Sequence, residues 1–122
     1  DSRSFQRILE KVMLRWIRDG VEVEGVGTWA DYSSRVCSAI DEIMKHEGAG
    51  KNVAVFTSGG PIAVTVQKAL NLSNEETLKI LWQIVNTSVT RFKYSGTRLA
   101  LFSFNDFFHL EETKDKRMIT YR

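Results

Sequence analysis

The stretch VAVFTSGGP, at Val53–Pro61, decides how this chain of 122 residues is interpreted. Its first five residues are apolar or β-branched, which is typical of a strand covered on both faces. Two glycines then make a tight turn. Pro61 suits the first turn of a helix, because its missing backbone donor would be unpaired there anyway. The sequence therefore predicts a strand at Asn52–Thr57, a turn, and a helix that ends near Leu70.

This turn has the form of an anion site. A strand, a glycine turn and a helix direct free backbone N–H groups and the positive end of the helix dipole at one point, which suits a phosphate group. Ser58 places a hydroxyl at the same point. A lone Gly-Gly turn is a weak signal, however, because glycines also permit close packing between a strand and a helix. The local pattern leaves both interpretations open.

Bulk properties exclude several classes of protein. The length suits one domain, and 43% hydrophobic with 26% charged residues is typical of a globular chain. The net charge of +2 comes without a basic block, so we expect no nucleic-acid or membrane partner. The single cysteine, Cys37, cannot form an internal disulfide, and no apolar run has membrane-spanning length. We therefore expect a cytoplasmic protein.

Capping residues and periodicity predict further helices. Apolar residues recur at helical spacing from Phe5 until Gly20 ends the pattern. Thr28 with Asp31, and Ser73 with Glu76, form two capping boxes that open further helices. The first of these helices should end near Gly48.

The remainder of the chain predicts strands. Thr87–Tyr94 and Thr97–Phe104 are expected to form a hairpin around Ser95-Gly96. The charged tail from Glu111 is expected to be loose; a short strand at Met118–Tyr121 is the alternative. Together the elements predict an α/β fold with helices on both faces of a sheet.

Four segments of the chain occur in a recognisable order: Trp29–Val36, Thr57–Gly60, Asn86–Thr90 and Phe104–Leu110. They are similar, in the same order, to the patterns Trp-x-x-Phe-x-x-Arg-Val, Ser/Thr-His-Gly-Gly, Asn-x-Ser-Val/Leu-Thr and Leu-Asn-Asp-x-x-His-Leu. These are motifs of the histidine phosphatase (phosphoglycerate mutase-like) superfamily. The chain therefore resembles the carboxy-terminal half of that superfamily over roughly Phe5–Glu111.

The resemblance implies a three-layer α/β/α phosphoglycerate mutase-like domain that is incomplete. Residues 1–122 would be the carboxy-terminal part of a single domain, because the family's Arg-His-Gly strand with the phosphate-accepting histidine is absent. In the family that strand lies between the strand leading to Ser58 and the strand after Asn86. Its absence would leave two unpaired edges. We therefore expect self-association or pairing with the missing amino-terminal half.

The resemblance also implies the site. Ser58 stands where the family has its second active-site histidine and is the candidate catalytic residue; Ser58, Gly59 and Gly60 would bind phosphate, and Asn86 would line the pocket. A hydroxyl donates one hydrogen bond and carries no positive charge, and charge-assisted bonds are roughly twice as strong. Losing such a donor costs on the order of a hundredfold in rate. No metal ion or cofactor is expected, and the partner would be a phosphorylated small molecule.

Three functional interpretations remain. The intact parent would be a phosphatase or mutase using phosphohistidine, with this chain inactive alone, or a non-catalytic pseudophosphatase that senses a ligand or binds a protein. Neither His46 nor His109, the only histidines, is placed as a nucleophile. A serine hydrolase with Ser58, Asp106 and His109 is disfavoured, because Phe56 stands where a nucleophile elbow requires glycine.

Overall fold

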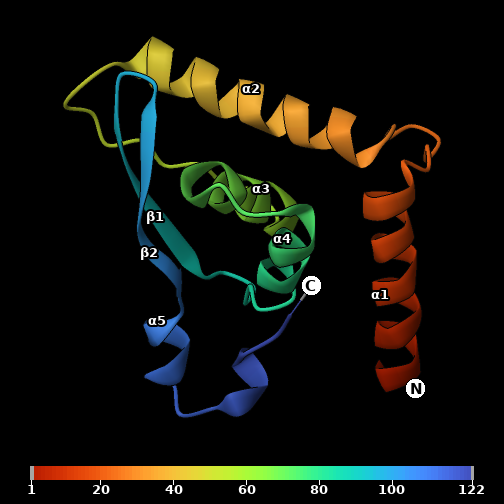
Figure 1. Ribbon diagram of the computed structural model, residues 1–122. Helices are drawn as coiled ribbons and strands as arrows, with labels where there is room; N and C mark the ends of the chain where they lie inside the picture. Colours follow the sequence, from red (N-terminus) through yellow and green to blue (C-terminus); the bar gives the residue numbers. More distant parts are fainter. Residues whose placement is uncertain (1, 122) are drawn as a thin grey trace.

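A computed structural model describes residues 2–121 (Figure 1). Four helices come first, followed by an antiparallel hairpin and two short helical segments. In chain order the elements are α1 (Ser2–Asp19), α2 (Trp29–Glu47), α3 (Gly59–Leu70), α4 (Asn74–Leu81), β1 (Val89–Ser95), β2 (Arg98–Asp106), α5 (Phe108–Glu111) and the 3-10 helix η1 (Lys116–Met118). The α/β fold class of a phosphoglycerate mutase-like chain is confirmed.

Both predicted capping boxes are present. The hydroxyl of Thr28 accepts from the Asp31 N–H at 3.2 Å, and the Asp31 carboxylate accepts from the Thr28 N–H at 3.0 Å. Ser73 and Glu76 make the same reciprocal pair at the start of α4. These bonds hold the pKa values of Asp31 and Glu76 below their usual range. The helix starts were therefore readable from local sequence alone.

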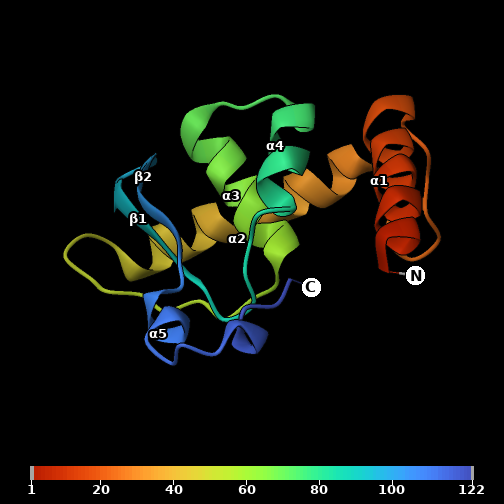
Figure 2. The same ribbon diagram turned by 90° about the horizontal axis from the view of Figure 1, so that it is seen from below.

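The core is built around α3, whose residues from Ala63 to Val66 are buried. Val64 joins Ile17 of α1, Trp29 of α2 and Leu78 of α4 in one apolar cluster. Figure 2 shows α3 beside both α2 and α4, with α1 at the edge of the molecule. Burial of α3 thus ties the four helices together and fixes where its amino end lies.

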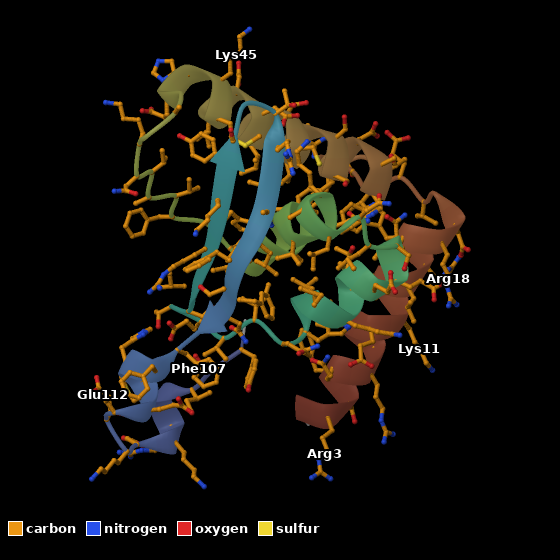
Figure 3. All side chains as sticks on the ribbon, turned by 60° about the vertical axis from the view of Figure 1, so that its left-hand side comes forward. Arg3, Lys11, Arg18, Lys45, Phe107 and Glu112 are labelled. Atoms are coloured by element: carbon orange, nitrogen blue, oxygen red, sulfur yellow. The ribbon has the colours of Figure 1, made fainter. Side chains whose placement is uncertain are left out.

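Helix α1 carries several basic side chains. Arg3, Lys11 and Arg18 project from this helix in Figure 3. Arg18 also fastens α1 to α4, because its Nε lies 2.7 Å from Oε1 of Glu75. The pair is exposed, so we assign it little stability.

The predicted hairpin is confirmed, with slightly different bounds. Strand β1 pairs antiparallel with β2, and Gly96 takes the positive φ of +58° that the turn requires. Alternate residues are half-buried, as in a sheet with one covered face. The Tyr94 hydroxyl donates to the Gly48 carbonyl at 2.6 Å and so holds the hairpin against the end of α2.

The predicted strand at Asn52–Thr57 is wrong for this structure. Residues 51–58 are extended but pair with no strand, and the described sheet consists of β1 and β2. Val55 is 52% exposed and Phe56 is 97% exposed. A strand is completed by hydrogen bonds to a neighbour, and residues 2–121 supply none here. The apolar side chains of this segment are therefore left uncovered by residues 2–121.

The carboxy-terminal tail differs from expectation as well. The predicted strand at Met118–Tyr121 is wrong, because the 3-10 helix η1 occupies Lys116–Met118. The tail is also not loose. Backbone N–H and side-chain amide of Asn86 donate to Thr120 at 2.8 and 3.0 Å, which anchors the tail at one point without a ladder.

Asn105 joins the end of β2 to the loop after α4. Its side-chain oxygen accepts from the buried Val85 N–H at 2.8 Å, and its amide donates to the Gln83 carbonyl at 2.6 Å. Its backbone φ is +56°, a conformation that asparagine tolerates better than most residues. One side chain therefore satisfies both a loop donor and a loop acceptor.

We predict that Asn105→Ala lowers the free energy of unfolding by about 3 kcal/mol, because it removes two hydrogen bonds and leaves the buried Val85 N–H without an acceptor. Asn105→Gly should cost about 1 kcal/mol less, since glycine accepts a positive φ freely. Urea unfolding measures both.

Asn71→Ala is the matched control. Asn71 has a φ of 55°, and its side chain makes no hydrogen bond to other described residues. Asn71→Ala should lower the free energy of unfolding by only about 1 kcal/mol, the cost of placing alanine at a positive φ. Equal losses at the two positions would contradict a stapling role for Asn105.

Candidate functional site

The amino end of α3 exposes the predicted anion-binding turn. Ser58 is the N-cap residue, with extended backbone at φ −93° and ψ 175°, and its side chain makes no capping hydrogen bond. Gly59 and Gly60 begin the helix. The first N–H groups of a helix lack intrahelical partners, and Pro61 has no N–H at all. The open backbone donors are therefore concentrated at the two glycines.

These glycines also serve close packing. A Cβ atom added at Gly60 would overlap the hydroxyl oxygen of Tyr32 on α2. At Gly59 it would lie 3.3 Å from Leu81 Cδ1 and 3.8 Å from Ile84. Both interpretations of the Gly-Gly turn are thus compatible. The absence of side chains lets α2 and α4 approach while the backbone donors stay at the helix end.

Asn86 follows a residue that packs beside this turn, but its own side chain has another partner. Ile84, two residues earlier, packs near Gly59. The side-chain amide of Asn86 itself donates to Thr120, and no hydrogen bond within residues 2–121 joins it to Ser58. Its role in a pocket stays a prediction, as do the phosphate-binding roles of Ser58, Gly59 and Gly60.

The hydrolase constellation is not assembled by hydrogen bonds. Asp106 accepts from the Phe108 N–H at 3.1 Å, while His109 Nε2 lies 3.3 Å from the Thr87 hydroxyl. Asp106 and His109 therefore have separate partners. His46 is exposed beside Glu47, as expected for a solvated residue.

Residues 2–121 contain neither a metal-binding cluster nor a membrane-spanning helix. No group of three or more His, Cys, Asp or Glu side chains is placed to hold a metal ion there. Within the same residues, no helix has the length and apolar character needed to cross a membrane.

Sequence reasoning missed the hydroxyl of Tyr32. It treated Tyr32 only as an apolar position of α2, at the place where the family motif has phenylalanine. Burial raises the pKa of Tyr32 above its usual value, opposed by the charge of Arg35, so the hydroxyl keeps its proton at neutral pH. The sequence did contain a signal for this hydroxyl. Tyrosine stands at a position where the family motif has phenylalanine, whose ring is enough for packing.

Comparison with known families decides the relationship. The family model described as Histidine phosphatase superfamily (branch 1) matches residues 2–107. The chain belongs to this superfamily. No curated protein and no solved structure gives a match. The matched region runs from α1 through β2 and includes the Ser58 turn, so the resemblance drawn from four motifs is confirmed at the level of the superfamily.

We predict that Gly60→Ala lowers the free energy of unfolding by about 1–3 kcal/mol, as overpacking does, although alanine is otherwise the better helix former. In a Tyr32→Phe background the same change should cost less, because the overlapping oxygen is gone. Thermal unfolding of the two single variants and the double variant gives the coupling between these positions.

Gly59→Ala is the control within the same turn, since its nearest neighbour is the flexible end of Leu81. It should cost less than Gly60→Ala. A Gly60→Ala cost that Tyr32→Phe leaves unchanged would contradict the close approach of α2.

Proposed function

We propose that this chain carries the phosphate-binding turn of a histidine phosphatase-type protein that acts on or binds a phosphorylated small molecule. The observation that supports the proposal is the superfamily match together with the exposed Ser58 turn at the amino end of a 12-residue helix. Backbone N–H groups and the helix dipole at such an end favour a phosphoryl group. A cytoplasmic location belongs to the same proposal.

The chemistry requires a residue from outside this chain. The superfamily resemblance implies transfer of the phosphoryl group to a histidine and then to water. The only histidines are His46, in the last turn of α2, and His109, on α5. We assign neither of them the role of accepting the phosphoryl group. We infer that the amino-terminal half of the domain supplies the nucleophile and that this chain alone transfers no phosphoryl group.

Ser58 sets the strength of the site. Its hydroxyl offers one neutral hydrogen bond where the family offers a charged donor, which is weaker by about a factor of two in energy. The turn keeps its backbone donors regardless of this change. The site should therefore bind phosphate but stabilise a transition state less well than a histidine would.

The same proposal accounts for the uncovered strand segment. Residues 51–58 are extended and unpaired, and β1 pairs only with β2 on one edge. Figure 1 shows this segment and the hairpin on the same side of the molecule. We propose that a strand from the amino-terminal half pairs between them; self-association is the alternative partner.

A pseudophosphatase is the second candidate. Ser58 specifically favours it, because loss of a charged donor reduces turnover more than it reduces backbone-mediated binding. In that case the turn would serve ligand sensing or protein interaction.

We predict that residues 1–122 show no phosphatase activity on p-nitrophenyl phosphate. In the intact parent protein, Ser58→His should raise turnover about ten- to a hundredfold by restoring a charged donor. Ser95→His, at the exposed end of β1, is the control for an added histidine and should have no effect.

Two other results have definite meanings. A parent that is inactive in both forms supports the pseudophosphatase. A parent that is fully active with serine and loses activity on Ser58→His shows a pocket rebuilt around the hydroxyl.

A further inference from the structure

Tyr32 is held rigidly beside the proposed phosphate site. Its ring centroid lies 5.7 Å from those of both Trp16 and Trp29, and the two tryptophans make an edge-on pair at 5.3 Å. Trp16 is itself fixed by donation from Nε1 to the Gly27 carbonyl at 2.9 Å. The aromatic cluster therefore leaves the ring of Tyr32 little freedom, and its hydroxyl has a defined position.

That position is at the first turn of α3. The hydroxyl oxygen occupies the space that a side chain at Gly60 would need. Cα–Cβ bonds in a helix tilt toward its amino end. The oxygen is therefore on the amino-terminal rim of α3, beside the residue whose N–H is one of the open donors.

The hydroxyl is also chemically available. It makes no hydrogen bond to another residue in the 2–121 range, and Tyr32 is only partly buried. A hydroxyl that packs beside a helix end in this way can donate to a ligand without breaking a contact in the protein. The family motif has phenylalanine here, so the oxygen is not needed to fill the aromatic cluster.

We propose that the Tyr32 hydroxyl donates a hydrogen bond to the phosphoryl group bound at Gly59 and Gly60. This inference rests on the proposed function and extends it. The second active-site histidine of the family is replaced by two neutral hydroxyls, Ser58 from the turn and Tyr32 from α2. Tyr32 is thus a ligand-binding residue that the motif comparison alone treats as packing.

Titration with inorganic phosphate, followed through the amide resonances of Gly59 and Gly60, tests the inference. Tyr32→Phe keeps the ring and its tryptophan contacts and removes one oxygen. We expect it to weaken phosphate binding about ten- to a hundredfold, as loss of a hydrogen bond to a charged group does. Tyr121→Phe, a half-exposed hydroxyl on the tail, should leave affinity unchanged.

A second readout separates binding from structure. Saturation with phosphate should raise the pKa of the Tyr32 phenol further, measured from its ring-carbon shift, because a bound anion opposes phenolate formation. The ring-carbon shift of Tyr94, whose hydroxyl donates to the Gly48 carbonyl, should not respond to phosphate. Unchanged dispersion of the amide spectrum checks that Tyr32→Phe is folded.

The outcomes distinguish the two proposals. If the unsubstituted protein and Tyr32→Phe bind phosphate at both glycines with equal affinity, Tyr32 has no role in binding, and the proposed site remains supported. No phosphate-dependent shift at Gly59 or Gly60 overturns the proposed site and the role of Tyr32 with it.

Discussion

The close approach of α2 to the first turn of α3 is the contact on which the site depends. Tyr32 packs where Gly60 has no side chain, and α3 is the helix around which the core forms. A Cβ atom at Gly60 would overlap the Tyr32 hydroxyl, so the Tyr32 side chain or one of the two helices would have to shift. The glycine is therefore a packing requirement and also leaves the helix end accessible. The same glycine can therefore permit close helix packing and leave backbone N–H groups open for a ligand.

A second constraint acts on the segment before that turn. Residues 51–58 have the composition of a buried strand but the exposure of a loop. Exposed apolar strand edges favour association with another strand. The superfamily match and this uncovered segment support the same proposal, that one further strand pairs next to the Ser58 turn.

Features that depend on local interactions were predictable from the sequence. The capping boxes at Thr28 and Ser73 need only residues three positions apart, and the hairpin needs only a glycine turn. The predicted strand at Asn52–Thr57 was wrong because pairing is a property of two segments, and residues 2–121 place no strand beside this one. The link through Asn105 and the hydroxyl of Tyr32 were missed because both act on residues distant in sequence.

Amide hydrogen exchange at Val53–Thr57 tests the central claim most directly, that this segment is a strand awaiting a partner beside the Ser58 turn. In residues 1–122 alone, the unpaired amides of this segment should exchange at rates typical of exposed loops. In the intact parent protein the account predicts that alternate amides slow at least about a hundredfold, as paired strands do. Equally fast exchange in both forms would contradict it.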